Sequence, residues 1–205
     1  MLRLFSYKMT HDSGFAPNPF WGELTIATCK PLIRLYKNRG DWIAGFTSGE
    51  LCGDPVGGEK LVYLMKVEER VPIADYYSSP RYRNKIPDAT HPLRVRQVGD
   101  NIYEPSAPGV FEQVANENHS CGDAEHDLSG EFVLTSTEFV YFGRSAIAIP
   151  EEIRPSLPAG QHPDGYRTHD ENLALEFIKH VFTQGSGVLA APHSWPAGDL
   201  SWKQI

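Results

Sequence analysis

Short runs of β-branched and aromatic residues, separated by turn-forming residues, recur through the first three quarters of the chain. Such runs are typical of β-strands, and the Gly and Pro residues between them indicate turns. The clearest examples are residues 42–46, which read WIAGF, and residues 61–68, which read LVYLMKVE. The pattern predicts strands at residues 2–6, 23–29, 42–46, 61–68, 100–103, 131–134, 138–142 and 146–149.

Helical patterns are fewer. Short helices are predicted at residues 31–39, 72–77 and 109–116, the first because Pro31 suits the first position of a helix. The longest helix is predicted to start at Thr168, where Thr168 and Glu171 match the T-x-x-E capping box. Its apolar positions fall on one face with a spacing of three and four residues, at Ala174, Phe177, Ile178, Val181 and Phe182.

Many short strands with few helices favour an α+β fold rather than a repeating βαβ fold. We expect a curved, mostly antiparallel sheet or a small barrel with a few flanking helices. No linker and no internal repeat divides the 205 residues, so the sequence predicts a single domain over residues 1–205.

Charge is distributed unevenly along the chain. The net charge of −7 disfavours indiscriminate binding to duplex DNA. Residues 97–143 contain nine acidic residues and no Lys or Arg, so the other residues hold all 19 basic residues. The acidic segment 97–143 is interpreted either as ordinary solvated loops or as a surface for a basic protein partner.

The sequence also indicates where in the cell the protein is expected. No apolar run approaches the roughly 18 residues that a membrane span needs, and the N-terminus is too short and too polar for a signal peptide. The three cysteines, Cys29, Cys52 and Cys121, lack C-x-x-C spacing. Reduced thiols in a cytoplasmic protein that does not bind a membrane are therefore expected.

Residues 7–46 combine reactive side chains with Gly, Pro and aromatic residues near the ends of predicted strands. If these strands are neighbours, the reactive groups converge on one site. His11 and Asp12 are then candidates for acid–base catalysis, Lys8 for electrostatic stabilisation and Cys29 for a nucleophile. The alternative is that the aromatic residues form the core and the charged residues lie on the surface.

The same stretch and the basic segment that follows contain candidates for binding a base. Trp21 and Trp42 can stack on a base, as aromatic side chains do in single-strand binding proteins. Hydrogen bonds and phosphate contacts are assigned to other polar side chains. These are Thr10, Asn18, Lys30, Arg34, Asp41, Arg81 and Arg83.

Several other kinds of site are excluded or disfavoured. The chain contains neither a dinucleotide-binding nor a phosphate-binding glycine loop, and no zinc-deaminase signature. His119, Cys121 and His126 can ligate zinc, but no fourth ligand has suitable spacing, so an exposed loop is favoured. Residues 162–169 are interpreted as a helix-capping loop, with an anion site as the alternative. No metal site is predicted, and no cofactor is identified.

Long words of the sequence resemble the nucleotide modification associated domain family, second type. The matching words are YKxTHDxGFAPNPF, LTIATCKPLIR, GDWIAGF, LVYLMKVEE, GDNIY and FVYFGRSAIAIP. A weaker similarity, over about the first 100 residues, is to PUA-like domains of the EVE and ASCH kind. The first resemblance implies a setting in DNA base modification or defence in bacteria or phages. The second implies an aromatic pocket for a flipped or modified base.

Three functions are compatible with these observations. The first is a protein that binds a modified base or nucleotide, free or in DNA, in an aromatic and polar pocket. The second is an enzyme of a base-modification pathway that uses His11, Asp12 and Lys30. The third is a non-catalytic subunit of a modification complex. The aromatic, Asn and Asp residues of segment 7–46 favour the first, because they are suited to holding a base.

Overall fold

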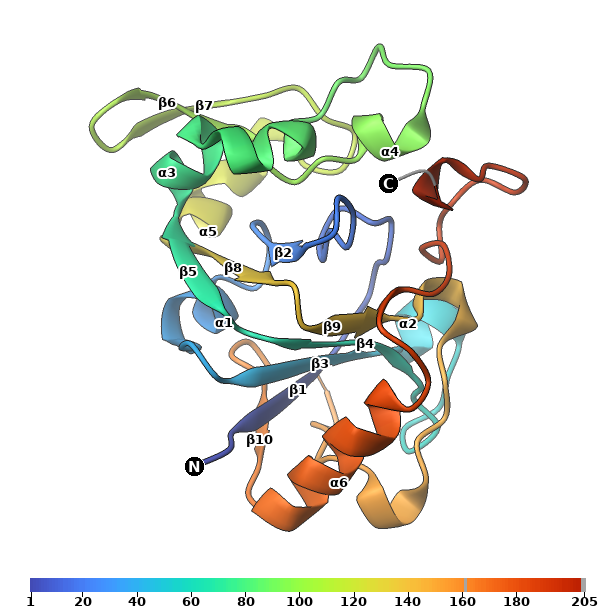
Figure 1. The fold of residues 1–205 in the computed structure, drawn as a ribbon. Helices are drawn as coiled ribbons and strands as arrows, with labels where there is room; N and C mark the ends of the chain where they lie inside the picture. Colours follow the sequence, from blue (N-terminus) through green and yellow to red (C-terminus); the bar gives the residue numbers. More distant parts are fainter. Residues whose placement is uncertain (161, 204–205) are drawn as a thin grey trace.

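The computed structural model describes residues 1–160 and 162–203, and a six-stranded sheet lies at its centre (Figure 1). The strands run in the order β10-β1-β3-β4-β9-β11. Their bounds are Leu4–Lys8 (β1), Trp42–Phe46 (β3), Leu61–Lys66 (β4), Phe139–Tyr141 (β9), Tyr166–Thr168 (β10) and Gly187–Val188 (β11). Strand β1 is parallel to β3 and β11 is parallel to β9, whereas the other neighbours are antiparallel.

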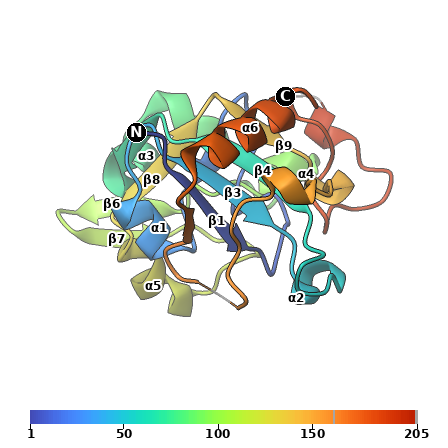
Figure 2. The same cartoon turned by 90° about the horizontal axis from the view of Figure 1, so that it is seen from below.

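Helix α6 (Glu171–Phe182) covers one face of this sheet, as the view from below also shows (Figure 2). Its apolar side packs against Ala44 and its neighbours on that face. The N-cap of the helix lies two residues later than the sequence predicts. Asp170 is the cap, and its carboxylate accepts hydrogen bonds from the N–H groups of the first turn. The capping box at Thr168 is therefore wrong, because Thr168 belongs to β10.

A second sheet packs on the opposite face. It has the order β2-β8-β5, with bounds Leu24–Ile26 (β2), Phe132–Ser136 (β8) and Glu69–Pro72 (β5). Ile43 points to this side, because successive strand residues alternate between the two faces. There it joins a buried cluster with Ile26 and with Ile33 of helix α1 (Pro31–Tyr36). The loop from β2 to α1 is thereby anchored against the central sheet.

The remaining elements pack around the second sheet or lie in loops, and the hairpin of β6 and β7 projects from the molecule (Figure 1). Strand β7 occupies the segment for which the sequence predicts a helix at 109–116, and that prediction is wrong. Gly109 adopts a φ of 75°, which permits the tight turn between the two strands. The bounds are Gly49–Cys52 (α2), Ile73–Ser78 (α3), Arg94–Gln97 (α4), Ala124–Leu128 (α5), Tyr103–Ala107 (β6), Val110–Gln113 (β7), Pro80–Lys85 (η1), Cys121–Asp123 (η2), Gly143–Ser145 (η3), Glu151–Ile153 (η4) and Ser201–Lys203 (η5).

The architecture is α+β with open, curved, mostly antiparallel sheets, which confirms the predicted fold class. The described residues form no closed barrel, so the barrel alternative is not realised. Within residues 1–160 and 162–203, no helix has the length and apolar character to cross a membrane.

Candidate active site

A cavity of about 630 Å³ opens where β1 and β2 end, between the central sheet and helix α5. Tyr7, Met9 and Ile26 contribute apolar surface to its wall. Cys29 and Lys30 line it from the turn that leads into α1. Its size is that of a small-molecule site, since such pockets usually enclose about 300–1,000 Å³.

The turn that carries Cys29 has an unusual backbone. Cys29 has a φ of 52° and Lys30 a φ of 39°, so two consecutive non-glycine residues are left-handed. This conformation is uncommon for residues with a Cβ atom, and it clusters at functional sites. A sharp strand-to-helix turn also presents the nucleophile in α/β-hydrolases. The fold therefore sustains local strain at the residue with the most nucleophilic side chain in the cavity.

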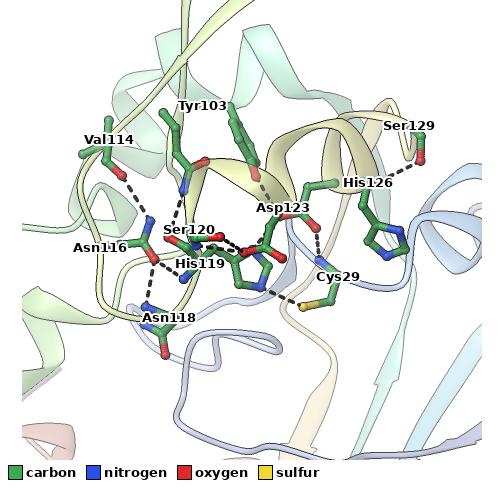
Figure 3. A network of polar contacts seen from close by, with 12 residues as sticks. Cys29, Tyr103, Val114, Asn116, Asn118, His119, Ser120, Asp123, His126 and Ser129 are labelled. Carbon is green, nitrogen blue, oxygen red and sulfur yellow. Dashed lines mark hydrogen bonds and ion pairs between the residues drawn. The ribbon is translucent and has the colours of Figure 1, made fainter.

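Cys29, His119 and Asp127 form a continuous line of polar contacts. The Sγ atom of Cys29 lies 3.2 Å from Nε2 of His119, as Figure 3 shows. On the other side of the ring, Nδ1 of His119 lies 2.7 Å from Oδ2 of Asp127. Thiol, imidazole and carboxylate in this order have the geometry of a catalytic triad, in which the carboxylate orients the base.

The surroundings of His119 favour its protonated form. Burial opposes the charge, but the hydrogen bonds to Asp127 and Cys29 outweigh it and raise the pKa of His119 to about 10. At neutral pH the ring is therefore an imidazolium that faces Cys29. A positive charge beside a thiol stabilises the thiolate, which is the nucleophilic form of cysteine.

The same three residues have the chemical character of metal ligands, with donor atoms within 4.8 Å of one another. However, both carboxylate oxygens of Asp127 already accept hydrogen bonds. Oδ1 accepts from the N–H of Cys29 at 2.6 Å, and Oδ2 accepts from Tyr103 Oη at 2.8 Å as well as from His119. This arrangement orients the imidazole and the Cys29 turn, and it fits a triad better than a metal centre.

Arg34 holds the Cys29 turn and α5 together from the interior. Its Nε donates to the carbonyl of Cys29 at 2.9 Å, and Nη1 donates to the carbonyl of Phe132 at 3.1 Å. Nη2 donates to the carbonyl of Asp127. The side chain is fully buried. The sequence assigns Arg34 to a phosphate contact, but the structure places its guanidinium among main-chain carbonyls.

We expect Gly130→Ala to destabilise the site. A Cβ atom on Gly130 meets the guanidinium carbon of Arg34 at 2.5 Å, and that group is fixed by its three carbonyl contacts. Overpacking of this kind costs about 1–3 kcal/mol, so thermal unfolding of the variant shifts down by several degrees. Gly122→Ala is the control, since its Cβ atom makes only an ordinary contact. Equal melting temperatures for the two variants would contradict the fixed position of Arg34.

The structure brings four predicted site residues into the cavity: Thr10, His11, Cys29 and Lys30. It separates His11 from Asp12, which the sequence pairs as an acid–base couple. Asp12 is buried, accepts a hydrogen bond from Tyr141 and lies 2.7 Å from Nδ1 of His193. His11 instead contacts Thr10.

The other predicted residues lie outside the described cavity lining, and most have partners in the fold. Lys8 pairs with Glu59, and Asp41 pairs with Arg3. These two ion pairs engage the charged groups for which the sequence predicts a role at the substrate. The rest are Asn18, buried in a network with Lys85; Trp21, under Arg96; Trp42, packed on Phe182; Arg81, paired with Glu23 and Glu69; and Arg83, exposed.

Sequence reasoning misses the partners of Cys29. His119 and Asp127 come from the acidic segment 97–143, about 90 residues farther along the chain. His119 is noticed only for a zinc motif with Cys121 and His126. In the structure it contacts Cys29, while His126 and Ser129 of the α5 region line the cavity. In the sequence, the signal for these partners is a His and an Asp within a segment that is otherwise interpreted as solvated acidic loops.

Comparisons with known proteins agree with the resemblance in the sequence. The model of the family described as nucleotide modification associated domain 2 matches residues 1–199. Neither the curated proteins nor the solved structures gave a match. The family description places the chain in nucleotide modification. Because the match spans almost the whole sequence, the chain belongs to the nucleotide modification associated domain 2 family.

Proposed function

We propose that the chain is a thiol-dependent enzyme that transforms a nucleotide or a substituent on its base, with Cys29 as the nucleophile. The observation that carries the proposal is the line of Cys29, His119 and Asp127, in which Cys29 lines a cavity. The family description supports the nucleotide as the kind of substrate.

The proposed reaction starts from the thiolate of Cys29 and the imidazolium of His119. The sulfur electron pair forms a C–S bond to an sp² carbon of the substrate, and the π pair moves to the attached heteroatom. That pair returns as the bond to an amine or alkoxide leaving group breaks, and His119 gives its proton to the leaving group. Water or a second nucleophile then attacks the same carbon, His119 takes its proton, and the thiolate leaves.

The alternative of a binding protein without catalysis has less support from the geometry. The proposed stacking residue Trp42 is buried against Phe182, and the proposed base-reading carboxylate of Asp41 is bound by Arg3. Neither lines the cavity in the part of the chain that the structure describes. A base reader does not require a nucleophile in line with an imidazolium and a carboxylate, whereas an enzyme does.

The test is a search for a consumed substrate. Wild-type protein is incubated with a bacterial nucleotide extract and, separately, with genomic DNA that is later digested to nucleosides. We expect mass spectrometry to show a nucleotide or nucleoside that the wild type consumes and that Cys29→Ala and His119→Asn leave intact. Cys52→Ala and Cys121→Ala are matched controls, since both thiols are exposed and outside the triad, and they should retain the activity. Equal consumption by Cys29→Ala, or no consumption in either fraction, would overturn the proposal.

A further inference from the structure

The cavity beside Cys29 differs in charge from the protein as a whole. Lys30, His11 and His126 line it, and the described lining residues include no Asp or Glu. The complete chain has 26 acidic residues and a net charge of −7. The Cys29 thiolate is offset by the imidazolium of His119, so Lys30 leaves an excess of positive charge that favours an anionic ligand. The imidazoles of His11 and His126 add groups that can form hydrogen bonds to it.

The remaining surface of the cavity suits a heterocycle. Tyr7, Met9, Ile26 and Pro163 offer aromatic, thioether and aliphatic contacts, while Thr10 and Ser129 offer hydroxyl groups. Pockets that hold small ligands combine such apolar walls with a few polar groups that fix the orientation. A volume of about 630 Å³ accommodates one nucleotide and leaves little space for neighbours along a strand.

Outside the cavity, the structure gives little support for contacts between basic side chains and a polynucleotide backbone. A protein that binds a nucleic acid strand needs basic side chains along successive phosphates. Of the four basic residues considered for phosphate contacts, Arg34 is buried, Arg81 is held by two glutamates, Arg83 is exposed and Lys30 lines the cavity. The cavity therefore presents a single lysine to a phosphate rather than a row of basic side chains.

We infer that the substrate is a free nucleoside monophosphate rather than a base within DNA. The inference rests on the proposed function and names the substrate class of the same site. Lys30, with His11 and His126, holds the phosphate, and the apolar wall holds the base. Modification therefore precedes polymerisation, so a kinase-type reaction that adds phosphate must act on the product before it enters DNA.

The test is a binding measurement in a Cys29→Ala background, which prevents turnover. The probes for calorimetric titration are the standard deoxynucleoside 5′-monophosphates, the matching nucleosides, inorganic phosphate and a short single-stranded oligonucleotide. We expect at least one monophosphate to bind about tenfold or more tightly than its nucleoside, the equivalent of about 1.4 kcal/mol. The oligonucleotide should bind no more tightly than that monophosphate.

Variants at Lys30 locate the phosphate. Lys30→Met should remove the advantage of the monophosphate over the nucleoside, and Lys30→Arg should keep it because the charge remains. Lys60→Met is the matched control, since Lys60 is exposed and pairs with Asp54 outside the cavity. Equal affinities for nucleoside and monophosphate, or tighter binding of the oligonucleotide, would overturn the inference.

The experiments can contradict the thiol mechanism and the substrate class independently of each other. Tight binding of a monophosphate, together with substrate consumption that does not depend on Cys29, would leave the ligand class standing and remove the thiol mechanism. Consumption that depends on Cys29 but occurs only in the DNA fraction would leave the mechanism standing and remove the free nucleotide.

Discussion

Alkylation of Cys29 by iodoacetamide between pH 6.5 and 9 is expected to be faster in the wild type than in His119→Asn. His119 retains its proton up to about pH 10, so Cys29 faces a positive charge across this range. In His119→Asn that charge is absent. An imidazolium favours the nucleophilic thiolate, so without it the rate at pH 6.5 should fall about tenfold or more. Peptide mass spectrometry after timed labelling measures the rate for each cysteine.

The other two cysteines provide an internal control. Cys52 and Cys121 are exposed, and burial and the nearby Asp54 raise the pKa of Cys52. Cys29 is the thiol that contacts His119, so the rates of Cys52 and Cys121 should be the same in the wild type and in His119→Asn. Equal Cys29 rates in the two proteins would show that the imidazolium does not activate the thiol.

The raised pKa of His119 also has a consequence for stability. A histidine whose pKa is higher in the folded state binds its proton more tightly there, so protonation stabilises the fold. This stabilisation is complete below the unfolded value of about 6.5 and is lost as the pH rises through about 10.

Replacement of Arg34 by Met is expected to lower the free energy of unfolding by about 4 kcal/mol. The substitution removes the guanidinium donor from the carbonyls of Cys29 and Phe132, and each buried unpaired group costs about 1–3 kcal/mol. The carbonyl of Asp127 keeps the backbone N–H of Gly130 as a donor. For a chain of this length the melting temperature should fall by roughly 10 °C. Denaturant titration and calorimetry measure the two quantities.

Two further variants separate the role of the guanidinium from that of its charge. Arg34→Lys keeps the charge but lacks the planar fork, so we expect an intermediate loss. Arg39→Met removes an exposed arginine from the same region and should change stability by less than about 0.5 kcal/mol. A loss of under about 1 kcal/mol in Arg34→Met would contradict the bridging role.

The local patterns in the sequence predict much of the fold. Strand β3 follows from a short aromatic and aliphatic run, and the start of α1 follows from Pro31. Errors arise where two local signals compete. Residues 109–116 have a weak helical pattern, but the left-handed Gly109 closes a hairpin instead. Asp170 outcompetes Thr168 as a cap because its carboxylate reaches two N–H groups.

The site is harder to predict, because its chemistry joins residues that are remote in sequence. The sequence predicts Cys29 at the end of a strand, and the structure places it in the turn after β2, but sequence reasoning pairs His11 with its neighbour Asp12. In the fold, successive residues there point in different directions, so His11 lines the cavity and Asp12 binds His193. No local pattern shows that a loop from residues 119–127 returns to the Cys29 turn.

Arg34 binds its neighbours through main-chain carbonyls, and this has a consequence for how such a site can diverge. Carbonyl groups are present whatever the side chain, so the path of α5 is maintained independently of the residues it presents to the cavity. His126 and Ser129 can therefore be exchanged for other side chains while Cys29 and His119 keep their relative positions. Relatives with this scaffold can therefore acquire new substrates through substitutions in the α5 region, while they keep the same reactive centre.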